Sequence, residues 1–129
     1  MKARTIYPGR VEGIALVSQQ PIGFYGGIDA KTGIVIEKGH ELEGESIKDK
    51  VLVFPYGKGS TVGSYVIYGL KKNNVAPLAI INKETETIVA TGAILAGIPC
   101  VDSIEIEEIK SGDRLRINAG EKEAEVVKI

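Results

Sequence analysis

The sequence predicts a single α/β domain, spanning residues 1–129, with the layers of a β/β/α three-layer sandwich. Two observations favour this class. The middle of the chain alternates apolar strands with helices, as a parallel or mixed sheet covered by helices requires. The two ends contain strands separated by glycine turns, which indicates a second layer made of strands alone. The length is sufficient for one domain with a hydrophobic core.

The first half of the chain is predicted to consist of strands and turns. Val11–Val17 has apolar residues at alternate and adjacent positions, which predicts a largely buried strand. Gly23–Asp29 is glycine-rich, and Ala30–Gly33 has the composition of a turn. Ile34–Ile36 predicts a short strand, and the polar segment His40–Ser46 predicts a loop.

The middle of the chain changes to an alternation of strands and helices. Val51–Phe54 is uninterruptedly apolar, which predicts a buried strand. Thr61–Asn73 then predicts a helix, with Ser60 as its N-cap and Lys71-Lys72 at the end where cations suit the helix dipole. The residues predicted on the apolar side of this helix are Val62, Tyr65, Val66 and Leu70.

The second strand–helix unit follows directly. Pro77–Ile81 predicts a buried strand, and Glu86–Ala96 predicts a helix that Gly97 ends. Ile98–Val101 predicts the next strand. The remaining chain alternates apolar and polar residues on both sides of a turn at Gly120-Glu121, which predicts a two-stranded ribbon formed by Ser111–Asn118 and Glu123–Val127.

Composition excludes several function classes. Sixteen Lys and Arg stand against seventeen Asp and Glu, so no basic excess favours nucleic acid or an anionic membrane. Aromatic residues make up only 5% of the chain, too few for a base-stacking platform. The single Cys100 and single His40 cannot form a disulfide framework or a metal site on their own. No long apolar run is present, so we expect a soluble, cytoplasmic protein that does not contact a membrane.

The sharpest local motif is the glycine-rich segment Gly57–Ser64, between a predicted strand and a predicted helix. Glycines let the backbone approach a ligand closely, and a helix start offers free N–H groups and a positive dipole end. Lys58 adds a formal charge. The segment is therefore suited to hold a carboxylate or phosphate, or to stabilise an alkoxide on Ser60. From the residues alone, a structural N-cap is the commoner role for a serine before a helix, and a solvated loop charge is the commoner role for a single lysine such as Lys58.

Two known motifs do not fit this segment. A P-loop requires a glycine where this sequence has Leu52 and a serine or threonine where it has Gly59. A serine-hydrolase elbow requires Gly-x-Ser-x-Gly and a histidine base. The segment has neither this spacing nor a neighbouring histidine, so nucleotide binding and serine hydrolysis are excluded.

Several segments, in this order along the chain, resemble the small subunit of aconitase X-type enzymes. The matching segments are Gly26–Asp29 with Thr32-Gly33, Val51–Pro55 with Gly57–Tyr65, Ala76-Pro77, Ala79–Asn82, Ile98-Pro99 and Gly112-Asp113. The resemblance implies the swivelling β/β/α fold of the last domain of aconitase. Aconitase has a glycine-serine-serine-arginine loop at this place, whose first serine is the catalytic base. By this resemblance Ser60 is the proton acceptor, while Val62 stands where aconitase has its substrate-binding arginine.

The resemblance also implies a reaction and a partner. The expected activity is the dehydration of (R)-mevalonate 5-phosphate to trans-anhydromevalonate 5-phosphate, a step of the archaeal mevalonate route to isoprenoids. A [4Fe–4S] cluster would be held by a large subunit in a heterodimer, and this chain would bind no metal itself. The residues expected to bind or surround the small phosphorylated hydroxy acid are Lys58, Gly59, Thr61, Gly26, Gly27 and Asp29. For Asp29, closure of a turn is an equally open role.

Other functions stay open beside this one. A hydroxyproline dehydratase is the nearest alternative in the same class, and a non-enzymatic module that binds an anion at the glycine loop is another. The mobile phosphohistidine domain of phosphotransfer enzymes shares the swivelling fold, but it requires a histidine where this chain has Ser60.

The other notable residues have structural interpretations. We expect His40 on the surface and Cys100 as a buried small hydrophobic residue. Tyr65 and Tyr68 are expected to pack in or near the core. The acidic segment Glu105–Glu108 predicts a solvated face rather than a metal site.

Overall fold

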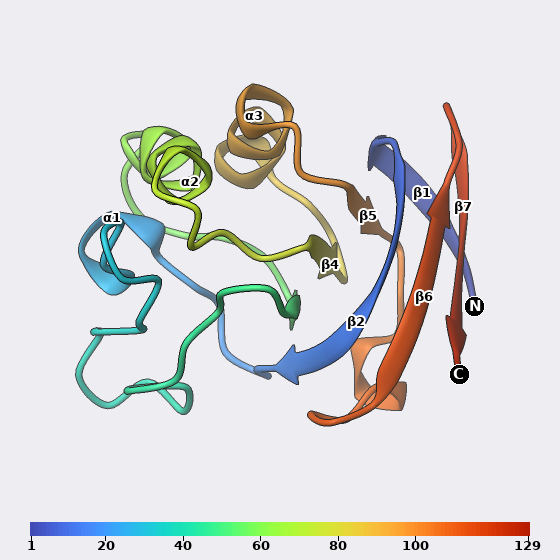
Figure 1. The fold of residues 1–129 in the computed structure, drawn as a ribbon, viewed down its shortest axis with the longest axis horizontal. Coiled ribbons are helices and arrows are strands. Elements are labelled where there is room, and N and C mark those ends of the chain that lie inside the picture. The colour runs from blue at the N-terminus through green and yellow to red at the C-terminus, as the bar shows by residue number, and fades with distance from the viewer.

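The computed structural model describes all residues 1–129, and its strands close into a seven-stranded barrel with the helices grouped on one side (Figure 1). The strands are β1 (Lys2–Tyr7), β2 (Gly9–Val17), β3 (Val51–Phe54), β4 (Ala79–Asn82), β5 (Cys100–Asp102), β6 (Arg114–Ala119) and β7 (Glu123–Lys128). The helices are α1 (Phe24–Gly27), α2 (Gly63–Lys72) and α3 (Thr87–Ala96), with a 3₁₀ turn at Ile106–Glu108. None of the helices is long and apolar enough to cross a membrane.

The order of strands around the barrel is β1-β5-β4-β3-β2-β6-β7. The pairs β2–β3, β3–β4 and β4–β5 are parallel, and the other pairs are antiparallel. The predicted α/β class is confirmed, and so is the β6–β7 ribbon. The three-layer description is not confirmed, because β1 pairs with both β5 and β7 and thereby closes the strands into one barrel. No strand was predicted at Lys2–Tyr7, whose residues are exposed or half-buried and show no continuous apolar run.

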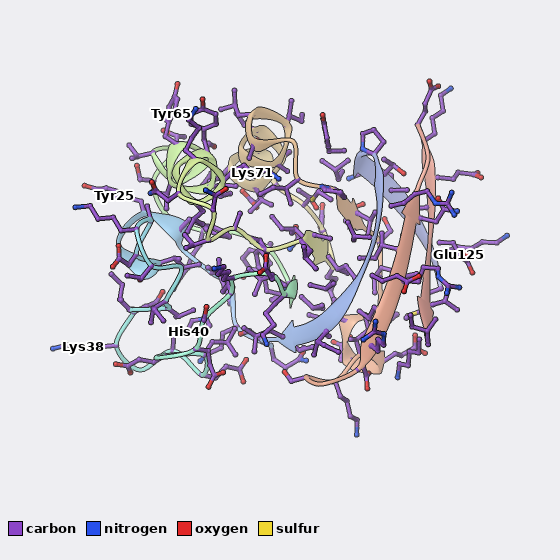
Figure 2. The ribbon with its side chains drawn as sticks, viewed as in Figure 1. Tyr25, Lys38, His40, Tyr65, Lys71 and Glu125 are labelled. Atoms are coloured by element: carbon purple, nitrogen blue, oxygen red, sulfur yellow. The ribbon has the colours of Figure 1, made fainter.

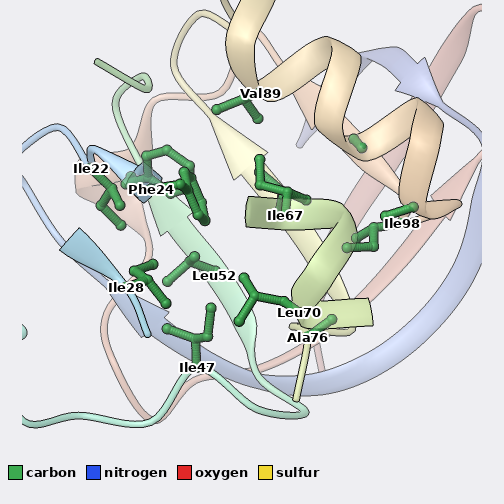
Figure 3. Close-up of a cluster of buried hydrophobic side chains, with 14 of the residues drawn as sticks. Ile22, Phe24, Ile28, Ile47, Leu52, Ile67, Leu70, Ala76, Val89 and Ile98 are labelled. Atoms are coloured by element: carbon green, nitrogen blue, oxygen red, sulfur yellow. The ribbon is translucent and has the colours of Figure 1, made fainter. Parts of the chain in front are cut away.

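The barrel wall separates two hydrophobic cores. Along β3, Leu52 and Phe54 point to the helices, whereas Val51 and Val53 point into the barrel. All four side chains have no solvent exposure, which explains why this strand is uninterruptedly apolar. Figure 3 shows the core on the helix side, where Leu52 lies with Ile67 and Leu70 of α2 and Val89 of α3.

Helix α2 packs on α3, and its predicted apolar side is correct only in part, because Leu70 is buried and Val66 is half-buried whereas Val62 and Tyr65 are exposed. Its buried residues are Gly63, Ser64, Ile67 and Leu70, whereas Tyr65 is 69% exposed and Tyr68 is 40% exposed. The placement of the two tyrosines in or near the core was therefore wrong. The cause is the close approach of the helices, since a Cβ added to Gly92 of α3 would lie only 2.9 Å from Cβ of Ile67. Gly92 has no side chain, so Ile67 of α2 packs against the backbone of α3, and the two tyrosines lie outside this contact.

Several predicted element boundaries also change. Ile34–Ile36 forms no strand and makes only isolated bridges to Ile28 and Ser46. Helix α2 starts at Gly63 rather than Thr61. The end of α3 is confirmed, because Gly97 adopts φ 69° and its N–H donates to the last turn of the helix.

His40 is buried, so its predicted surface position was wrong. Its neighbours are polar and exposed, but its ring turns inward and bonds to two backbone groups, Pro21 O and Leu42 N. Burial of Cys100 is confirmed, and burial raises the pKa of its thiol to about 12. The carboxylates Glu105, Glu107 and Glu108 are exposed, as predicted for a solvated face.

The closure of the barrel places Arg4 of β1 against Asp102 of β5. The guanidinium donates to both carboxylate oxygens at 2.9 and 2.7 Å, and Thr85 N donates a further hydrogen bond at 2.8 Å. Burial alone raises the pKa of Asp102, but these hydrogen bonds lower it by more, so the pKa lies below its ordinary value. The ionised form is therefore favoured by folding.

We expect Asp102→Asn to destabilise the protein in a pH-dependent manner. Because the folded pKa of Asp102 lies below the unfolded value of about 3.9, its contribution is present above about pH 4. That contribution is lost as the pH falls through the folded pKa. The difference in unfolding free energy between the native chain and the variant, measured with urea, should therefore shrink below about pH 4. A constant difference across that range would contradict this account.

Candidate functional site

The candidate site is the loop between β3 and α2, at the carboxyl end of β3, which pairs in parallel with β2 and β4. Gly59 adopts φ 87°, in the left-handed region that favours glycine, and nothing lies within 4 Å of the place a Cβ would occupy. Ser60 follows with an exposed side chain. Its Oγ accepts a hydrogen bond from Val62 N at 3.1 Å. Ser60 is thus not the N-cap of α2, because the cap position is Val62 and the serine closes its own small turn ahead of the helix.

Consecutive backbone donors are free in this loop. The N–H groups of Gly59, Ser60 and Thr61 donate to no group of the chain. The next two N–H groups donate to Ser60, from Val62 to Oγ and from Gly63 to the carbonyl oxygen at 2.9 Å. The loop therefore combines an exposed hydroxyl, one donor already aimed at its oxygen, and a run of donors available to an anion.

The fold brings the other predicted glycine segment next to this loop. Ile22 forms a parallel bridge with Gly57, and Lys58 N donates to Ile22 O at 3.0 Å. A Cβ added to Gly63 would lie 3.6 Å from Tyr25 N, so the start of α2 packs directly on α1. Gly26 has φ 81° and open space around it. The chain therefore places Gly26-Gly27 beside the serine loop.

Lys58 is paired with a residue that the sequence did not single out. Its Nζ lies 3.3 Å from Glu37 Oε2, and both side chains are partly exposed. Glu37 Oε1 is 3.3 Å from the place a Cβ of Gly27 would occupy, so the carboxylate lies over the glycine backbone. The charge of Lys58 is partly compensated, and an anionic ligand has to compete with Glu37 for it.

Asp29 has a local role in the structure. Its Oδ1 accepts from Lys31 N at 3.0 Å, and its Oδ2 accepts from Thr32 Oγ1 at 3.1 Å. Both carboxylate oxygens are engaged within its own turn, which is the structural role that the sequence left open.

Glu86 organises the site, although the sequence analysis gave it no role. Its Oε1 accepts from Gly57 N at 2.8 Å, and its Oε2 accepts from Ile88 N and Val89 N. It thus caps α3 and holds the stem of the serine loop at the same time. Ser64 Oγ donates to Ile88 O at 2.7 Å and ties the start of α2 to the same turn. In the sequence, a carboxylate directly before an apolar helix was the available signal for the helix cap. The bond to Gly57 joins distant parts of the chain and had no signal in the sequence.

The chain offers no site for a metal cluster. No group of three or more His, Cys, Asp and Glu side chains comes together, and the only thiol, Cys100, is fully buried. The residues present therefore do not fit an iron–sulfur cluster.

The fold formed by the barrel and the paired helices is that of a known class of domain. The chain belongs to the aconitase X swivel-domain family, whose model matches residues 1–127. The small subunits of phosphomevalonate dehydratase from Thermococcus sibiricus and Thermococcus onnurineus are 55% and 58% identical to it, over 98% of this chain and 97% of each relative. The crystal structure of Thermococcus kodakaraensis aconitase X in its holo-form contains a chain with TM-score 0.93 and 52% identity, covering 99% of both chains. The family resemblance stated from the sequence is confirmed.

We expect Glu86→Ala to lower the unfolding free energy by about 1–2 kcal/mol, because it leaves helix N–H groups and the Gly57 N–H without their acceptor. Glu86→Gln keeps one carbonyl oxygen and should lose about half as much. Urea denaturation measures both. Glu84→Ala, at an exposed neighbouring position, is the control and should stay within about 0.5 kcal/mol of the native chain. An equal effect of the Glu84 and Glu86 variants would contradict this role.

Proposed function

We propose that this chain is the small subunit of a hydro-lyase that dehydrates (R)-mevalonate 5-phosphate to trans-anhydromevalonate 5-phosphate, with Ser60 as the proton acceptor. The names of the relatives, which match nearly the whole chain, support the reaction. The observation that supports Ser60 is its exposed hydroxyl within a loop of free backbone donors. The single swivelling domain, the cytoplasmic location and the heterodimer expected from the sequence belong to the same proposal.

The loop offers what a serine base needs. Removal of a proton next to a carboxylate requires a strong base, and a neutral hydroxyl is a weak one. The N–H of Val62 already donates to Ser60 Oγ, so it stabilises the alkoxide without any rearrangement. The backbone groups of Gly59 and Thr61 lie on either side of Ser60 and add to the positive potential there.

The free N–H groups also suggest how an anionic substrate is held. Val62 provides an apolar side chain where the aconitase loop has an arginine, so it cannot pair with a carboxylate. The N–H groups of Gly59, Ser60 and Thr61 have no partner in the chain and can donate to a carboxylate or phosphate oxygen instead. Lys58 supplies further charge once its contact with Glu37 is exchanged for the ligand.

A partner chain is part of this proposal. The cluster implied by the sequence resemblance would belong to a large subunit, where it would supply Lewis-acid chemistry, because the residues of this chain do not fit it. Exposed apolar side chains surround the serine loop, with Tyr25 62% exposed, Val62 44% exposed and Tyr65 69% exposed. Figure 2 shows Tyr25 and Tyr65 at the same end of the molecule. We propose that the large subunit covers this surface.

The first test is Ser60→Ala in a complex co-expressed with the large subunit and assayed without oxygen. Turnover of (R)-mevalonate 5-phosphate should fall by about 10²–10⁴-fold, the usual contribution of a general base, while assembly is preserved. Hydroxyproline, assayed in parallel, tests the alternative substrate.

The matched control is Ser46→Ala. Ser46 Oγ accepts a hydrogen bond from Lys48 N, two residues on, just as Ser60 Oγ does from Val62 N. Loss of the same small turn elsewhere should leave turnover unchanged. Near-native turnover of the Ser60 variant would overturn the assignment of the base. Binding of mevalonate 5-phosphate by the isolated chain, with no turnover by any complex, would instead favour an anion-binding module.

A second test concerns the partner surface. Tyr65→Glu places a charge among these exposed apolar side chains and should weaken assembly with the large subunit at least tenfold, since interface aromatic residues often contribute more than about 1.4 kcal/mol. Analytical ultracentrifugation of the mixed subunits measures the dissociation constant. Val127→Glu, on exposed β7 at the other end of the molecule, is the control (Figure 1). Equal dissociation constants for both variants would exclude this surface.

A further inference from the structure

We propose that His40 is a positioning residue, which holds the serine loop in place through Pro21 and Ile22. This inference rests on the proposed function of Ser60. It concerns residues 36–42 of the long connection between α1 and β3, of which the catalytic proposal uses only Glu37.

The hydrogen bonds of His40 define one orientation and one tautomer of its ring. Its Nδ1 lies 3.1 Å from Leu42 N, and its Nε2 lies 3.1 Å from Pro21 O. A backbone N–H can only donate, so Nδ1 is the acceptor and carries no hydrogen. Nε2 therefore carries the hydrogen and donates it to the carbonyl oxygen of Pro21. His40 is only 6% exposed, so water has little access to these bonds.

Glu41 connects the same two segments through further hydrogen bonds. Its Oε1 accepts from Ser18 Oγ at 2.6 Å and also from the backbone N–H groups of Gln19 and Gln20. In return, Gln20 Oε1 accepts from Glu41 N at 2.8 Å. The hydrogen bond from Ser18, the largest effect, lowers the pKa of Glu41. We call this set of contacts between residues 18–21 and 40–42 the clasp.

The clasp lies one residue away from the stem of the serine loop. Ile22 follows Pro21 directly, donates through its N–H to Tyr56 O at 3.3 Å and accepts from Lys58 N at 3.0 Å. These bonds flank Gly57, and Ser60 is only two residues beyond Lys58. A displacement of Pro21 is therefore passed through Ile22 to the backbone that carries the catalytic hydroxyl.

The connection also reaches the second glycine segment. Gly27 O accepts from Ile36 N at 2.8 Å and from Glu37 N at 3.3 Å, and the side chain of Glu37 contacts Lys58. Residues 36–42 thus touch both segments of the site and the chain that leads into them. This arrangement assigns residues 36–42 a function in alignment, which a solvent-exposed loop would not have.

Two conservative substitutions each keep a different one of the two hydrogen bonds of His40. The amide nitrogen of glutamine reaches the position of Nε2, so His40→Gln keeps the bond to Pro21. The amide oxygen of asparagine takes the position of Nδ1, so His40→Asn keeps only the bond to Leu42. In the assembled enzyme, His40→Asn should lower kcat by about 10–10²-fold with KM nearly unchanged, because misplacement of a catalytic group by about 1 Å has effects of that size. His40→Gln should retain kcat within about threefold.

A second measurement keeps the inference testable without turnover. Hydrogen exchange of the peptide 56–60, followed by mass spectrometry on the assembled complex, reports on the bond from Lys58 N to Ile22 O. Hydrogen exchange of this peptide should be faster than native in His40→Asn and native-like in His40→Gln. A merely structural role would lower the melting temperature and the yield of both variants without separating their kcat values.

The outcomes distinguish this inference from the proposed function. If both His40 variants keep native kcat and native exchange at 56–60, the positioning role is wrong. If exchange separates the variants but Ser60→Ala remains active, the clasp positions the loop and the proposed base is wrong. Should both variants fail to assemble, exchange in the isolated chain decides between the same two results.

Discussion

The complete burial of β3 is the constraint on which the rest of the structure depends. Its alternate side chains fill the barrel on one side and contact the helices on the other, so no residue of the strand is free to meet water. Hydrogen bonds to β2 and β4 fix its direction and register. The loop that carries Ser60 begins at the carboxyl end of this strand, so the position of β3 decides where the loop starts.

The candidate site is assembled where neighbouring parallel strands end. The chain leaving β2 supplies Ile22, the chain leaving β3 supplies Ser60, and the chain leaving β4 supplies Glu86. Because carboxyl ends of parallel strands lie at one edge of a sheet, segments far apart in sequence meet there. The N–H groups of Gly57 and Lys58 donate to the Glu86 carboxylate and to Ile22 O, which joins the three segments. The alignment of the hydroxyl therefore depends on the barrel rather than on the loop alone.

Sequence patterns predicted those features that depend on local chemistry. Uninterrupted apolar runs identified β3 and β4, strict alternation identified the β6–β7 ribbon, and Gly97 marked the end of α3. The glycine-serine motif located the candidate loop and its exposed serine. What could not be predicted depends on contacts between distant residues. The buried face of α2 is decided by Gly92 of α3, the inward turn of His40 by Pro21, and the strand at Lys2–Tyr7 by partners at the other end of the chain.

The closure of the barrel also sets the order in which the protein can fold. Strand β1 pairs only with β5 and β7, roughly a hundred residues further along the chain, whereas β3, α2, β4 and α3 contact neighbours close in sequence. The unit that contains the serine loop has the shorter loops to close and is expected to form early. The pairing of β1 with β5 and β7, like that of β2 with β6, closes loops of about a hundred residues and is expected to be the slower step of folding.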